Sequence, residues 1–105
     1  MGFNAIKEVQ SSCFKFRPAT TADKDWVMIE MKEPDTCSAT LGYRGPGYGA
    51  HTINLGRSAN CATKSTVIHE LLHIMGVQHE QNRPDRDDYI TIHWEKFQVK
   101  YETQF

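Results

Sequence analysis

The segment that most restricts the fold is residues 63–77, where apolar side chains recur on nearly every side of a predicted helix. A helix of this kind is normally buried, so the rest of the chain has to cover it. Thr63 or Ser65 can cap its start, and Gly76 is placed to end it in a left-handed conformation. The apolar residues are Val67, Ile68, Leu71, Leu72, Ile74 and Met75.

Upstream of this helix, the apolar residues follow the two-residue period of β-strands. Residues 42–49 contain four glycines and one proline, a composition that predicts a loop. Residues 4–10 have a helix-forming composition, and residues 89–92 suit a short strand or a turn. The strand candidates are Cys13–Phe16, Trp26–Met31, Ser38–Tyr43 and His51–Leu55.

Length and charge narrow the classes of function. The 105 residues suit one small domain. The formal net charge is −1 and both signs are interleaved, which argues against nucleic acid or an anionic membrane as a partner. No apolar stretch reaches the roughly 18 residues of a membrane span, and the first ten residues lack the apolar run of a signal peptide. The three cysteines leave at least one unpaired within the chain.

The strongest indication of chemistry lies between residues 69 and 79. His69 and His73 are four residues apart, so both imidazoles leave the same face of a helix. Two nitrogens so placed can bind one tetrahedral zinc ion, and Gly76 lets the chain turn so that His79 can return as a third ligand. Three protein ligands leave one coordination position open, which is typical of a catalytic zinc site.

Glu70 follows His69 directly and lies beside the metal without being aimed at it. Zinc lowers the pKa of a bound water toward about 7 and polarises the scissile carbonyl. Glu70 can act as general base toward that water and then return the proton to the departing amine. The pattern therefore predicts a zinc metalloprotease with a peptide or protein substrate.

Two other interpretations compete with this one. A buried helix with incidental histidines is disfavoured, because three neutral imidazoles inside an apolar helix need polar partners. A structural zinc domain is disfavoured, because it has no use for Glu70 or for an open coordination position. His51 and His93 have a spacing that fits no metal site, so a structural or surface role is expected for both.

The pattern from His69 to His79 is the extended motif of the metzincin zinc proteases. Residues 79–87 narrow it further, because they resemble the astacin family continuation His-Glu-x-x-Arg-x-Asp-Arg-Asp. Upstream, residues 13–17 resemble the family's Cys-x-x-Phe segment. Residues 37–42 resemble its Cys-x-Ser-x-x-Gly segment, with the serine one place early. The resemblance covers nearly the whole chain.

The resemblance implies a fold, a compartment and a set of site residues. Astacins are secreted or membrane-anchored endopeptidases, so an extracellular protein with one zinc ion per chain is expected. The implied fold is α+β: a metzincin-like upper subdomain with a twisted, mostly parallel sheet of about four strands and a buried zinc-binding helix. The strand at the cleft edge, here within Ser38–Tyr43, would pair with extended substrate. Cys61 lies eight residues before His69, as in the family, which implies a disulfide between Cys37 and Cys61.

The chain also departs from the family pattern. The family's partner for the cysteine at position 13 lies near the end of the complete catalytic domain. The Met-turn, Ser-x-Met-His-Tyr, is absent from these residues, and so is the opening strand. Residues 1–105 are therefore expected to form a partial peptidase domain, an upper subdomain without the lower one. An alternative stays open for this form: a catalytically incomplete fragment that binds zinc or peptide without cleavage.

Overall fold

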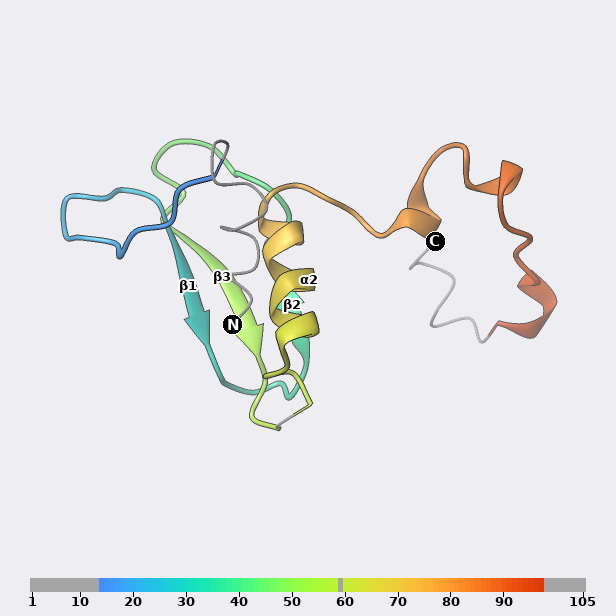
Figure 1. The fold of residues 1–105 in the computed structure, drawn as a ribbon, viewed down its shortest axis with the longest axis horizontal. Helices are drawn as coiled ribbons and strands as arrows, with labels where there is room; N and C mark the ends of the chain where they lie inside the picture. Colours follow the sequence, from blue (N-terminus) through green and yellow to red (C-terminus); the bar gives the residue numbers. More distant parts are fainter. Residues whose placement is uncertain (1–13, 59, 98–105) are drawn as a thin grey trace.

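The computed structural model describes residues 14–58 and 60–97 (Figure 1). A three-stranded sheet is covered on one face by helix α2, and a segment with three short 3₁₀ turns extends away from them (Figure 1). The helix predicted at residues 4–10 lies outside the described residues. The elements are β1 (Trp26–Glu30), β2 (Cys37–Ala39), β3 (Ala50–Leu55), α2 (Lys64–Ile74), η1 (Glu80–Asn82), η2 (Arg86–Asp88) and η3 (Trp94–Lys96).

The sheet has the order β1-β3-β2, with β3 in the centre. β1 runs parallel to β3, with Trp26 opposite Ala50, whereas β2 runs antiparallel to it, with Cys37 opposite Leu55. Three strand candidates are therefore present, and the described sheet has one parallel and one antiparallel pair instead of a mostly parallel set of four. Residues 14–16 are not a strand. Alternation tells which face a side chain takes, but it does not supply the neighbouring strand that a ladder requires.

The edge strand β2 is shorter than the predicted Ser38–Tyr43. Thr40 N still donates to Thr52 O at 3.0 Å, but Thr52 N donates to the Thr40 side chain instead of its carbonyl. Gly42 then takes a positive φ of 68°, which strands do not use. The ladder ends because a side chain replaces one backbone acceptor and the chain turns at the glycine.

The core lies between β3 and α2. Ile53 and Leu55 of the strand meet Val67 and Leu71 of the helix, and Ile53 and Leu71 are almost fully buried. The composition predicted a helix buried on all sides, but Leu72, about 100° around the helix from Leu71, is 40% exposed. A helix against a single sheet layer can bury only the stripe that faces the sheet.

Both ends of α2 are capped. Thr63 is the N-cap, and its hydroxyl accepts a hydrogen bond from Thr66 N at 3.2 Å. At the other end, Gly76 N donates to His73 O and Val77 N donates to Leu72 O, at 2.9 and 3.0 Å. This is a Schellman motif, and the φ of 95° at Gly76 is the conformation that a glycine supplies.

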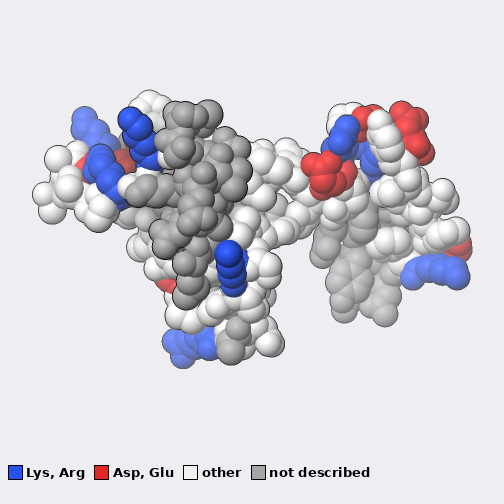
Figure 2. All heavy atoms as spheres, viewed as in Figure 1, with Lys and Arg blue, Asp and Glu red and all other residues white. Residues whose placement is uncertain are grey.

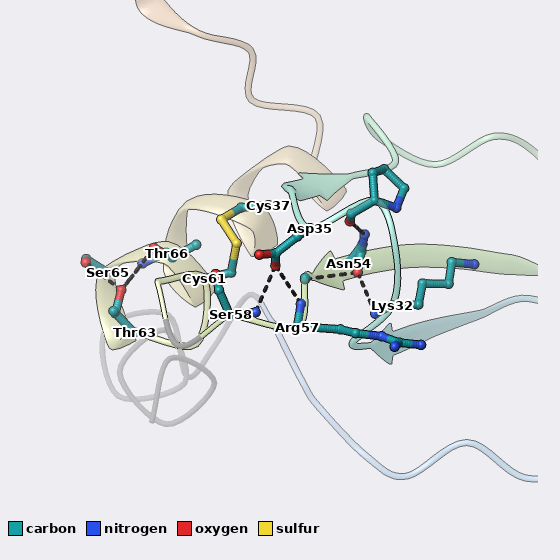
Figure 3. Close-up of a disulfide and its surroundings, with 12 residues drawn as sticks. Lys32, Asp35, Cys37, Asn54, Arg57, Ser58, Cys61, Thr63, Ser65 and Thr66 are labelled. Atoms are coloured by element: carbon teal, nitrogen blue, oxygen red, sulfur yellow. Dashed lines mark hydrogen bonds between the residues drawn. A yellow bond between two sulfur atoms is a disulfide. The ribbon is translucent and has the colours of Figure 1, made fainter.

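A disulfide joins Cys37 of β2 to Cys61 just before α2, the pairing that the family resemblance implies (Figure 3). Hydrogen bonds fasten the same region beside it. The Asp35 carboxylate accepts from Arg57 N and Ser58 N at 2.7 and 2.8 Å. Asn54, which is buried, donates to Pro34 O at 3.1 Å (Figure 3). The start of the edge strand is thus held to the connection between β3 and α2 by covalent and polar contacts.

Candidate metal centre

Three imidazoles meet beside the C-terminal half of α2. His69 and His73 project from the helix, and His79 returns to them from the segment that follows. His79 Nε2 lies 3.3 Å from His69 Nε2 and 3.1 Å from His73 Nε2. The three potential ligand atoms all lie within 4.8 Å of one another, and the sequence pattern predicted that the same three residues would converge.

The two separations from His79 Nε2 fit a tetrahedral zinc ion. Imidazole nitrogens bind zinc at about 2.0–2.1 Å, so two nitrogens at neighbouring corners of a tetrahedron are about 3.3–3.4 Å apart. The two short distances from His79 Nε2 lie close to that value. A neutral His₃ set is also the donor set of known catalytic zinc sites. The residues present therefore fit the metal.

The second nitrogen of His73 fixes which nitrogen faces the centre. His73 Nδ1 lies 2.7 Å from Val77 O, and a carbonyl oxygen only accepts hydrogen bonds. Nδ1 therefore carries a proton, and in the neutral ring the Nε2 lone pair is then available on the side of His79. A hydrogen bond of this kind orients metal-binding histidines and sets their tautomer. Sequence inspection missed this contact because it comes from a backbone carbonyl and has no residue signature.

Glu70 lies between the histidine face and the core face of α2. At about 100° per residue, Glu70 falls between the direction shared by His69 and His73 and the direction of Leu71. The Glu70 side chain is buried, with 4% of the residue exposed. Its Oε2 atom has no hydrogen-bond partner among the residues that the structure describes. A buried oxygen without a partner is costly unless it interacts with something further, such as a water or a substrate group.

The turn after His79 is tied by a charge cluster. The Arg83 guanidinium donates to the Asp85 carboxylate at 2.8 and 2.9 Å and to Glu80 at 3.1 Å. These contacts lower the pKa of Asp85 and raise that of Arg83. Figure 2 shows acidic and basic side chains side by side on this C-terminal segment. The pairs are exposed, so they fix the local turn more than they stabilise the fold.

The other two histidines lie apart from this group, as expected from their spacing. His51 is buried at the start of β3, where its Nε2 accepts from Arg44 N at 3.0 Å. His93 is exposed and pairs with Glu95. Across residues 14–58 and 60–97, only His69, His73 and His79 form a potential metal-binding group.

The chain is similar in sequence and structure to members of one peptidase family. The model of the peptidase family described as "Astacin" matches residues 3–105. The chain belongs to the astacin family. The structure of high choriolytic enzyme 1, a hatching enzyme zinc-protease from medaka fish, matches this astacin chain with a TM-score of 0.80 and 30% identity. That match covers 98% of the chain and 48% of the medaka protein.

Curated relatives agree with this assignment. Zinc metalloproteinase nas-13 of Caenorhabditis elegans is 35% identical over 96% of the chain, a match that spans 21% of nas-13. Astacin-like metalloprotease toxin 2 of Loxosceles intermedia is 34% identical over 80% of the chain and 30% of the toxin. The chain thus spans less than a third of either relative. No helix in the described part of the chain is both long and apolar enough to cross a membrane.

Proposed function

We propose that this astacin chain is the zinc-binding part of an endopeptidase, with His69, His73 and His79 as ligands and Glu70 as general base. The observation that carries the proposal is the convergence of three imidazoles whose ligand atoms lie within 4.8 Å of one another, with two of the separations close to the edge of a zinc tetrahedron. Family membership supports the choice of zinc and of peptide bonds, because the relatives are named zinc metalloproteinases. A protein of this family is expected to act outside the cell.

The protein's own residues divide the work of hydrolysis. Bound zinc would supply a Lewis acid that activates water and polarises the scissile carbonyl. Glu70, whose Oε2 has no partner among the described residues, accepts the proton of the attacking water and returns it to the leaving amine. His73 stays in the correct tautomer through Val77 O.

The edge strand supplies a surface for the peptide. β2 is the last strand of the described sheet on the side that packs against α2. Thr40 turns its N–H toward β3, so the backbone groups of its neighbours Ala39 and Leu41 alternate toward the free edge. An extended peptide that adds to this edge would be held by backbone hydrogen bonds and would run beside the helix that carries His69 and His73.

Zinc content and peptide hydrolysis, measured together, test the proposal. Wild-type protein should hold about one zinc per chain. His73→Ala should lose the metal, whereas His93→Ala, which changes an exposed histidine outside the group, should keep it. Glu70→Gln should keep the zinc and lower hydrolysis of a general protein substrate by at least about 100-fold. Full zinc content in His73→Ala would refute the ligand assignment, and loss of zinc in Glu70→Gln would refute the division of roles.

The alternative for the 105 residues by themselves is a fragment that binds zinc or peptide without cleavage. They span 48% of the medaka enzyme, so part of a complete cleft can come from sequence outside them. If wild-type protein binds one zinc but does not cleave, and a longer protein that contains these residues does cleave, the 105-residue form is a metal- or peptide-binding fragment. Cleavage by the longer protein alone would also support the assignment of residues 1–105 as an upper subdomain of a larger peptidase domain.

A further inference from the structure

The glycine-rich loop touches helix α2 through Gly42. Its backbone N–H donates to His73 O at 2.8 Å. Gly42 has a φ of 68°, and a Cβ built on it would lie 3.5 Å from Gly76 Cα. The loop therefore reaches the helix at a residue of the histidine group and passes at van der Waals distance from the glycine that ends the helix.

The chain before Gly42 is fixed by the sheet. Thr40 and Thr52 exchange two hydrogen bonds, one from each backbone N–H, at 3.0 and 3.1 Å. Only Leu41 separates this pair from Gly42. The direction from which Gly42 approaches the helix is thus set by β3, the most buried strand of the described sheet.

The chain after Gly42 is fixed by a carboxylate. Asp25 accepts hydrogen bonds from Gly47 N and Gly49 N, both at 2.9 Å, and from the Tyr43 hydroxyl at 3.3 Å. The three donors lie on both sides of the loop tip. Gly42 is therefore held between two anchored segments, and its N–H is presented to the helix instead of moving with a free loop.

The backbone oxygen of His73 accepts the hydrogen bond that joins this loop to the candidate metal centre. It belongs to the last turn of α2, where helix carbonyls lack partners within the helix. It accepts from Gly76 N at 2.9 Å as well as from Gly42 N. The same peptide group thus connects the loop, the backbone of His73 and the turn that brings His79 back.

We propose that Gly42 is a positioning residue of the metal centre, which holds the end of α2 in the conformation that lets His73 and His79 meet. The inference rests on the zinc site of the proposed function. It adds a contact outside the ligand motif, made by a backbone N–H of the loop that follows the edge strand.

Paired glycine variants test this role. Gly42→Ala and Gly45→Ala both place a side chain at a positive φ, 68° and 103°, so both strain the backbone of the same loop, but Gly45 is not one of the donors to Asp25. A Cβ at Gly45 meets nothing within 4 Å. Because the strain at Gly42 falls on the residue whose N–H reaches His73 O, Gly42→Ala should weaken zinc binding about fivefold relative to Gly45→Ala, the fold-change that corresponds to about 1 kcal/mol. The dissociation constants are measured by competition with a zinc chelator.

A second measurement uses the unmodified protein and does not depend on how a variant folds. Coupling between two sites is reciprocal. If the Gly42 contact strengthens zinc binding about fivefold, saturating zinc should stabilise that contact by the same factor. Hydrogen exchange of the Gly42 amide should therefore slow about fivefold on addition of zinc, with a smaller change at Gly47.

The outcomes separate this inference from the proposed function. If wild-type protein binds zinc at the three histidines but the two variants bind it equally, the role of Gly42 is wrong and the zinc site stands. Exchange of the Gly42 amide at the rate of an unstructured peptide would overturn the role as well. If wild-type protein binds no zinc, the proposed function fails first and this inference fails with it.

Discussion

Breaking the Cys37–Cys61 disulfide is expected to lower the free energy of unfolding by about 3.5 kcal/mol. The cysteines are 24 residues apart, and the chain-entropy relation for a closed loop of about 25 residues gives this value at 25 °C. The native fold should persist, because hydrogen bonds from Arg57 and Ser58 to Asp35 hold the same segments together without the bond. The free energy of unfolding then falls because the reduced unfolded chain has more conformational freedom, and not because the native fold loses contacts.

The assay compares oxidised and reduced protein by urea unfolding. Cys13→Ser in both samples prevents exchange with the third thiol. With Trp94→Phe in both samples, Trp26, which is 40% exposed at the start of β1, provides a fluorescence signal for loss of the sheet. The urea midpoint should fall on reduction, and the slope m should rise slightly because the reduced unfolded chain exposes more surface.

Two results would contradict this prediction for the disulfide. A change in unfolding free energy below about 1 kcal/mol would show that closing this loop does not restrict the unfolded chain as the relation assumes. Loss of the helical circular dichroism signal on reduction, before any urea is added, would show that the contacts to Asp35 do not hold the region. Reduced Asp35→Ala protein should unfold at a lower urea concentration than reduced wild-type protein or oxidised Asp35→Ala protein.

Two further predictions concern the core and the loops. Leu71→Ala should lower the free energy of unfolding by about 2–5 kcal/mol, because Leu71 is 1% exposed. Leu72→Ala, at a position that is 40% exposed, should lower it by less than about 1 kcal/mol. Equal effects of the two variants in urea unfolding would contradict the assigned orientation of the helix. Backbone N–H donors lower the pKa of Asp25 and of Asp35 in the folded protein. The two ionised carboxylates therefore stabilise the fold above about pH 4, and this stabilisation is lost as the pH falls through the lowered pKa values. The urea midpoint of metal-free protein should therefore fall between about pH 5 and about pH 3, and Asp25→Asn should flatten that dependence; an unchanged slope would contradict the role of Asp25.

The sequence predicted the grouping of the three histidines better than it predicted the sheet. The spacing of His69 and His73 is a local property of one helix, so the helical period of about 3.6 residues alone places both rings on one face. Strand pairing is not local, because it depends on which distant segment supplies the neighbouring ladder. The alternating pattern at residues 13–16 therefore suggested a strand, yet residues 14–16 have no strand conformation in the structure.

Burial of the helix was overestimated for a related reason. Apolar residues on nearly every side of residues 63–77 predicted a fully buried helix, but composition does not say how many layers cover it. In the described residues, one sheet face covers Val67 and Leu71, and Leu72 stays open. The family resemblance supplied the disulfide between Cys37 and Cys61, which no pattern within this single sequence could have paired.

The motif predicted that the chain turns at Gly76 and brings His79 back to the helix. It did not predict which groups hold this turn in place. The positive φ of Gly76 ends α2 and turns the chain, and that conformational requirement is readable from one glycine at the right distance from His73. The groups that hold the turn are the carbonyl of Val77, which fixes the His73 ring, and the N–H of Gly42, which holds the His73 carbonyl. Both are backbone atoms, so their partners are set by the path of the chain and not by side-chain identity. We therefore expect zinc binding to change less when the Val77 side chain is replaced than when Gly42 or Gly76 is replaced by a residue that resists a positive φ.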